Sequence, residues 1–434
     1  MPGWTKLPTP HAMVQHLDRF VHGQDRAKRY LALCVYRHYA AMAYRESHPE
    51  LRHPFGKRHA LLLGPTGSGK TYLVTTLAEF LGVPVAFVNA TSLVETGYVG
   101  EHVDSIFRRL LTQTRGNVAQ AERGIVFLDE IDKVRRQDVG GQRDVSGEGV
   151  QTSLLAPLDG CPIDLRGDYT GTIIDSAKVL FVGTGAFSGL ATVIRRRLGA
   201  GRTMGFTADG EDYSTLSDDE ALARGELQDL EAYGFIPEFL GRFAVISTVS
   251  SLSRTDLVAI LRDTEDSPLR RQIRWFEQHG VRLVVPEETL AHLADLAIAT
   301  RSNARGLERI VAKKLANLEW QLPELMRQGV CQITLTPEAL AGSAHPAMRI
   351  SDHAGRRPPI ELLRSRAASL LNSTPGRVEA EKPRLNEQTT GQIQRAAAPK
   401  RHPVPARRRS KTVSAPGIRQ LHLPFAREGP DARP

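Results

Sequence analysis

One stretch of the sequence decides the fold: His59-Ala60-Leu61-Leu62-Leu63, followed by Gly64-Pro65-Thr66-Gly67-Ser68-Gly69-Lys70-Thr71. The second part matches the pattern G-x-x-x-x-G-K-[ST] in full, and a helical pattern over residues 71–81 follows it. A buried strand, a glycine-rich turn and a helix in this order predict a phosphate-binding loop. Glycines let backbone N–H groups surround phosphate oxygens, and the helix N-terminus adds the positive end of its dipole.

The residues of this loop are the first candidate ligands of a nucleotide. We expect Lys70 to meet the β- and γ-phosphates and the Thr71 hydroxyl to bind Mg²⁺. The other predicted nucleotide-binding residues are the rest of the loop: Gly64, Pro65, Thr66, Gly67, Ser68 and Gly69.

A second motif, Ile125-Val126-Phe127-Leu128-Asp129-Glu130, places two carboxylates at the C-terminal end of a buried strand. Ligands of parallel sheets bind at that edge. We expect Asp129 to hold Mg²⁺ through water and Glu130 to polarise the attacking water. Together the two motifs predict Mg-dependent hydrolysis of a nucleoside triphosphate, but they do not say what the released energy drives.

Short apolar runs separated by helix-length segments predict a large α/β domain over residues 1–250. A parallel sheet with helices on both faces is expected. Its expected strands are 59–63, 85–89, 124–128, 179–183 and 244–248.

Residues 251–345 are expected to form a smaller, mostly helical α+β domain. Apolar residues at three- and four-residue steps predict an amphipathic helix over 305–326, which Pro323 should kink or end near its last turn. Short strands are expected over 281–285 and 331–335.

The net charge of +9 comes from the C-terminal part of the chain. Residues 351–434 carry 17 Lys and Arg against 7 Asp and Glu, a balance of +10. The totals of 57 and 48 leave 40 basic and 41 acidic residues in 1–350, a balance of −1. We therefore predict that residues 346–434 form a basic, Pro- and Arg-rich, largely disordered tail. Such a tail could bind nucleic acid without defining the activity of the core.

The composition argues against several classes of protein. No run reaches 18 apolar residues, as a membrane-spanning helix requires, and residues 1–6 lack the pattern of a secretory signal. The cysteines Cys34, Cys161 and Cys331 lie far apart and offer neither a zinc knuckle nor a disulfide framework. A reducing cytoplasm is therefore the expected location.

Several segments together resemble the ClpX family, hexameric AAA+ unfoldases that feed substrates to the ClpP peptidase. The resemblance covers about residues 8–340 and rests on five segments in the family's order. They are Thr9 to Gln24 with Val21-His22-Gly23-Gln24, Gly97-Tyr98-Val99-Gly100-Glu101, Arg143 to Gln151, Phe235 to Arg242, and Ala304-Arg305-Gly306-Leu307.

This resemblance implies an AAA+ fold and an ATP-driven unfoldase that forms a homo-hexamer and acts on polypeptides together with a ClpP-type peptidase. It implies that Val21 and His22 lie beside adenine and that Arg305 contacts the nucleotide phosphates. It also implies that Arg242 acts as an arginine finger on the γ-phosphate of a neighbouring subunit. The expected bound species are ATP and Mg²⁺.

Loops add three further expectations. Tyr98 and Val99 are implied to line a central channel, where an aromatic ring can grip varied sequences. Met204-Gly205-Phe206 lies where the family has its peptidase-docking tripeptide, with Met in the place of Ile or Leu, although this loop could also fold back on its own domain. Thr184 lies at roughly the position of sensor 1, where a hydroxyl could orient water.

The sequence also departs from the family. We expect no N-terminal zinc-binding domain, and the loop over 161–175 lacks the basic patch that helps the family to receive substrate tags. Two other functions stay open: a stand-alone remodelling chaperone without a peptidase, and a nucleic-acid motor suggested by the tail. The near-neutral core and the aromatic loop favour a protein motor. The related HslU is not favoured, because 28 residues between Gly100 and Asp129 leave no room for its inserted domain.

Overall fold

The computed structural model describes residues 7–51, 59–93, 101–139, 142–144, 146–165, 169–200, 213–300 and 303–350. All of them belong to one compact unit, Met1–Ser369. Among these residues, no helix combines the length and the apolar character needed to cross a membrane.

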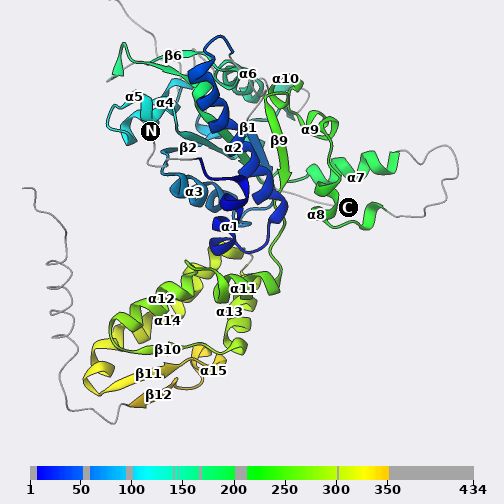
Figure 1. The fold of residues 1–434 in the computed structure, drawn as a ribbon. Coiled ribbons are helices and arrows are strands. Elements are labelled where there is room, and N and C mark those ends of the chain that lie inside the picture. Colours follow the sequence, from blue (N-terminus) through cyan, green and yellow to red (C-terminus); the bar gives the residue numbers. More distant parts are fainter. Residues whose placement is uncertain are drawn as a thin grey trace, which may run out of the picture. The chain divides into compact units, whose positions relative to one another are not determined.

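Five parallel strands form the central sheet, in the order β2-β3-β8-β1-β9 (Figure 1). Each lies within one or two residues of a predicted strand: β1 (His59–Leu63), β2 (Val85–Asn89), β3 (Ile125–Asp129), β8 (Leu180–Gly185) and β9 (Phe243–Thr248). The prediction of a parallel sheet covered by helices is therefore confirmed. Because all five strands run the same way, their carboxyl ends meet at one edge of the sheet.

The sheet is buried on both faces because its strands carry apolar residues at nearly every position. In β1, Ala60 and Leu62 join one hydrophobic cluster, while Leu61 and Leu63 join another on the opposite face. Alternate side chains of a strand point to opposite faces, so a continuous apolar run serves two cores.

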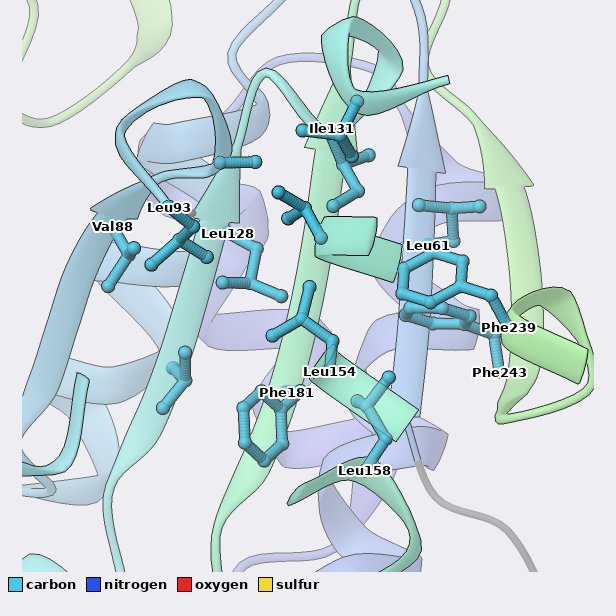
Figure 2. Close-up of a cluster of buried hydrophobic side chains, with 14 of the residues drawn as sticks. Leu61, Val88, Leu93, Leu128, Ile131, Leu154, Leu158, Phe181, Phe239 and Phe243 are labelled. Carbon is cyan, nitrogen blue, oxygen red and sulfur yellow. The ribbon is translucent and has the colours of Figure 1, made fainter. Parts of the chain in front are cut away.

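Helices supply the other half of each core. The helices α1 (Pro10–Phe20), α2 (Asp25–Ser47) and α3 (Lys70–Leu81) pack on one face. On the other face, α4 (Asp104–Gln113) and α6 (Ser146–Asp159) pack with the shorter helices that precede β9. Figure 2 shows this second core, where Leu154 and Leu158 of α6 lie near Leu61 of β1 and Phe181 of β8.

The remaining elements of this part are short. The helices are α5 (Val118–Ala121), α7 (Leu190–Ala200), α8 (Asp218–Ala223), α9 (Leu227–Tyr233) and α10 (Pro237–Leu240). Two hairpins add the strand pairs β4 (Gln137–Val139) with β5 (Gln142–Asp144) and β6 (Pro162–Asp164) with β7 (Ile173–Asp175).

A third hydrophobic cluster, with no member in common with the other two, is built entirely from residues between Leu257 and Leu340. It belongs to α11 (Arg254–Asp263), α12 (Pro268–Gln278), α13 (Glu287–Ala299), α14 (Asn303–Arg327), α15 (Pro337–Ala341) and a sheet of order β10-β11-β12. A separate core supports the predicted small domain, although the boundaries at residues 250 and 345 stay predictions.

Helix α14 lies within two residues of the predicted range 305–326 and ends at Arg327, about one turn after Pro323. A proline near the last turn removes only one backbone bond, and Gln328 N still donates to Glu324 O at 3.0 Å. The strands β10 (Arg282–Val284) and β11 (Val330–Thr334) lie close to the predicted positions. The strand β12 (Ala347–Ile350) pairs antiparallel with β11, in residues that we had predicted as the start of the tail.

Leu154 offers a test of the core beneath α6, since it is fully buried. We expect Leu154→Ala to lower the free energy of unfolding by about 2–5 kcal/mol, because the lost methyl groups leave a cavity that the sheet cannot fill. Thr152→Ala, at an exposed position of the same helix, should change it by less than about 0.5 kcal/mol. Chemical denaturation of both variants measures the difference, and equal values would contradict the packing described.

Candidate functional site

The phosphate-binding loop joins β1 to α3 at the carboxyl edge of the sheet. Gly64 must be a glycine, because any Cβ atom there would clash with the backbone carbonyl of Val249. Gly69 has a φ of +94°, a left-handed conformation that favours glycine, and it precedes α3 without a side-chain cap. Uncapped N–H groups at the start of a helix of this length form a site for anions.

Lys70 is a buried cation at the base of this loop, with a relative exposure of 8%. Its Nζ atom donates to the carbonyl oxygens of Gly64 at 2.6 Å and Pro65 at 2.8 Å. Burial lowers the pKa of Lys70 to about 8, while the carboxylates of Asp129 and Asp132 act in the opposite direction. The amine therefore lacks a full counter-charge, and a phosphate anion would supply it.

Asp129 lies at the end of β3 and is fixed by two donors. Its Oδ1 atom accepts hydrogen bonds from Thr184 Oγ1 at 2.8 Å and from the Glu130 backbone N–H at 2.9 Å. Thr184 is fully buried in the neighbouring strand β8. The hydroxyl that we placed at sensor 1 therefore contacts the carboxylate predicted to hold Mg²⁺.

Glu130 contacts a residue that the sequence analysis missed. Asn89 Nδ2 donates to Glu130 Oε2 at 3.0 Å, because β2 and β3 are neighbours and Asn89 pairs in register with Asp129. The signal was available in the sequence, since a polar residue ends the predicted strand 85–89 at the same edge of the sheet. Which of the other strands lies beside it could not be derived from the sequence.

Asp132 is a second residue that we did not single out. It is almost fully buried, its Oδ1 atom accepts from the Ala186 N–H at 3.1 Å, and Lys133 Nζ lies 3.4 Å from Oδ2. A Cβ atom on Gly185 would clash with this carboxylate, so the end of β8 is shaped around it. Asp132 ties β3 to β8 beside the phosphate-binding loop and adds negative charge near Lys70.

A cavity of about 610 Å³ brings most of the predicted site together. Of the residues that we predicted, those lining it are Val21, His22, Thr66, Gly67, Ser68, Gly69, Lys70, Thr71, Asp129, Glu130 and Arg305. Gly64 and Pro65 belong to the loop without lining this cavity. The loop, the acids and Arg305 come from three segments that together span more than 200 residues of the sequence, so their convergence supports a common ligand.

Two cations of the cavity lining, Lys70 and Arg305, lie close enough to interact. Arg305, in the first turn of α14, lowers the pKa of Lys70, so the two positive charges act on each other. Next to it, Asn303 Nδ2 donates to the carbonyl oxygen of Thr66 in the phosphate-binding loop at 3.3 Å. Two cations and a helix N-terminus at one place form a strong site for a polyanion.

Part of the cavity lining is apolar. Val21 is buried, and the side chains of Phe20, Leu252 and Ile260 line the cavity near the N-terminal segment. His22 Nε2 lies 3.4 Å from Asp256 Oδ1. An apolar recess with polar groups at its rim suits a flat aromatic base.

Arg242 does not line this cavity. Its Nη2 atom donates to Asp159 Oδ2 at 2.6 Å, and its Nη1 atom donates to the carbonyl oxygen of Glu238 at 3.2 Å. The structure therefore does not bring Arg242 to the phosphate-binding loop of its own chain.

Five predicted residues lie outside the described residues: Tyr98 and Val99 of the channel loop, and Met204, Gly205 and Phe206 of the docking loop. Their roles stay predictions.

Comparisons with known proteins agree with this geometry. Residues 57–246 match the family model of the AAA domain (Cdc48 subfamily). The chain is also 38% identical over 326 residues to the ATP-dependent Clp protease ATP-binding subunit ClpX of Borrelia duttonii (strain Ly), across 73% of this chain and 75% of that protein. The matched AAA domain spans the phosphate-binding loop, both acidic residues and Arg242. Fold, site and similarity together show that this chain belongs to the ClpX family of AAA+ ATPases.

Proposed function

We propose that this protein is an ATP-driven unfoldase and translocase that feeds polypeptides to a ClpP-type peptidase. One observation carries the proposal: a single cavity unites the phosphate-binding loop, the Asp129–Glu130 pair and Arg305. The name of the Borrelia relative, an ATP-binding subunit of an ATP-dependent Clp protease, supports the peptidase partner.

In this proposal the loop N–H groups, Lys70 and Arg305 bind the triphosphate, and the apolar recess around Val21 binds adenine. Thr71 and Asp129 would hold Mg²⁺, and a hydroxyl beside a carboxylate fits the oxygen ligands that this ion prefers. When bound, Mg²⁺ neutralises charge on the β- and γ-phosphate oxygens.

Glu130 is proposed to orient and polarise the attacking water. In the structure its Oε2 atom accepts from Asn89, which fixes a carboxylate that lines the cavity. Arg242 completes the site from a neighbouring subunit in a homo-hexameric ring, since it does not reach the cavity of its own chain. Nucleotide contacts on both the phosphate-binding loop and Arg305 of α14 let hydrolysis move these elements. Tyr98 and Val99 are proposed to transmit that motion to a polypeptide in the channel.

We expect Glu130→Gln to bind ATP and form hexamers normally but to hydrolyse ATP at least about 10²-fold more slowly, because the general base is lost. The control is Glu231→Gln, at an exposed position of α9, which should hydrolyse ATP at the normal rate. Steady-state ATPase assays with a separate binding measurement check both. Normal turnover by Glu130→Gln would contradict the assigned role.

The affinity for ATP should fall at high pH. The pKa of Lys70 is about 8 in the empty site, and bound phosphates raise it. Affinity is then fully present below about pH 8 and falls progressively as the pH rises from 8 towards the higher pKa of the bound state, since binding must then take up a proton. We expect binding about tenfold weaker at pH 9 than at pH 7, measured in the Glu130→Gln background. In the same background Lys70→Arg should give a flat profile, whatever its affinity. A flat profile with Lys70 intact would contradict the lowered pKa.

The whole activity is tested by unfolding of a tagged fluorescent protein with ATP, with and without ClpP. Loss of fluorescence followed by degradation only with ClpP is the expected result. Met204→Ala with Phe206→Ala should abolish degradation but keep unfolding. If the unsubstituted protein and the double variant both unfold the substrate but neither binds ClpP, the stand-alone remodelling chaperone would be favoured instead. ATP hydrolysis that never unfolds a substrate would exclude both.

A further inference from the structure

We propose that Asp159 is a positioning residue for Arg242. Its carboxylate holds the guanidinium so that two N–H groups are left for the nucleotide of a neighbouring subunit. This inference rests on the proposed function, in which Arg242 acts on that neighbour.

Asp159 and Arg242 form a two-point ion pair within one chain. Arg242 Nε lies 2.5 Å from Asp159 Oδ1, and Arg242 Nη2 donates to Asp159 Oδ2 at 2.6 Å. A third contact, from Nη1 to the carbonyl oxygen of Glu238 at 3.2 Å, fixes the rotation of the guanidinium group. The side chain of Asp159 is 53% exposed and that of Arg242 is 26% exposed, so the pair lies at the surface, where a second chain can reach it.

The donors of Arg242 can be counted. A guanidinium has five N–H groups: one on Nε and two on each terminal nitrogen. Asp159 Oδ2 accepts from one N–H of Nη2 and the Glu238 carbonyl accepts from one N–H of Nη1. Nε lies 2.5 Å from Asp159 Oδ1 but is buried and makes no hydrogen bond. On the terminal nitrogens, one N–H of Nη1 and one of Nη2 are left, and such guanidinium donors bind phosphate oxygens well.

The backbone on both sides of the pair is held rigidly. Leu158 precedes Asp159, while Phe239 and Phe243 flank Arg242, and all three are buried in the same core (Figure 2). The rings of Phe239 and Phe243 pack edge to face with centroids 5.1 Å apart.

Gly160 fixes the end of α6 directly after Asp159. Its φ is +89°, and a Cβ atom there would lie 2.6 Å from Ala177 Cβ. The backbone at Asp159 and at Arg242 therefore cannot shift without disturbing the core. A side chain held by rigid elements keeps its geometry.

Helix stability alone does not explain the acid at this position. Asp159 is the last residue of α6, where a negative charge opposes the helix dipole. The cation of Arg242 offsets this unfavourable interaction. The ion pair therefore has a role other than capping the helix.

We expect Asp159→Asn to lower kcat for ATP by between about tenfold and about a hundredfold, because the guanidinium loses its orientation. The KM for ATP should not change, since the finger is proposed to act on charge that develops in the transition state. The hexameric state should not change either. Asp159→Glu, which keeps the charge, should recover part of the rate. The matched control is Asp295→Asn. It breaks a pair of the same form, Arg254 Nε to Asp295 Oδ1 at 2.5 Å with both side chains 51% exposed, and should leave kcat unchanged.

Mixed rings separate positioning from a structural role. A Glu130→Gln subunit cannot hydrolyse ATP but carries an intact Arg242, whereas an Asp159→Asn subunit has the opposite defect. In rings assembled from equal amounts of both variants, some Asp159→Asn subunits bind ATP next to a Glu130→Gln subunit, whose Arg242 is correctly oriented. Such a site combines an intact Glu130 with an oriented Arg242 and forms at about a quarter of the subunit contacts. About a quarter of the normal ATPase rate should therefore return.

Several results would overturn the inference. They are an unchanged or increased kcat in Asp159→Asn, and a loss in Asp159→Asn that the Glu130→Gln subunits do not rescue. Full activity of Arg242→Ala would instead refute the proposed role of Arg242 itself, so the two failures are distinguishable.

Discussion

The close approach of the Val249 backbone to Gly64 is the constraint on which the site depends. It is possible only because residue 64 has no side chain, and it lets Val249 N donate to Leu63 O at 2.7 Å where β1 ends. The chain leaving β9 therefore passes directly behind the phosphate-binding loop. This course of the chain after β9 also brings Leu252 into the lining of the nucleotide cavity. Any larger residue at position 64 would displace the loop and the chain segment that leads to the third hydrophobic cluster.

The lining of this cavity carries both cations and carboxylates. Lys70 is held away from water, and its amine donates to carbonyl oxygens of its own loop. Arg305 adds a second cation from a helix whose core is separate. The acids Asp129 and Glu130 in the same lining are held by Thr184 and Asn89. A triphosphate with a metal ion would satisfy both groups of charges at once, which is why two nearly independent cores can be coupled through one ligand.

In the proposed function, Arg242 is prepared in one subunit for use in another. Arg242 is placed by two buried phenylalanines and oriented by Asp159, although neither residue touches the cavity of its own chain. An unpaired arginine on a surface samples many rotamers, and fixing them on assembly costs entropy. Because the ion pair with Asp159 already restricts the side chain of Arg242 in the single subunit, less entropy is lost when the proposed ring forms.

The strands, the phosphate-binding loop and the two acids could be predicted from the amino-acid sequence, because they depend on local patterns: apolar runs, glycine spacing and carboxylates that directly follow a strand. Resemblance to a family also predicted that Val21, Arg305 and Thr184 lie near the nucleotide, without giving their contacts. The contact of Asn89 with Glu130, the burial of Asp132 near Lys70 and the ion pair of Asp159 with Arg242 depend on the three-dimensional fold. The reason is physical: strand order and helix packing bring together residues separated by 41, 62 and 83 positions, and no local pattern encodes which distant partner a polar side chain will find.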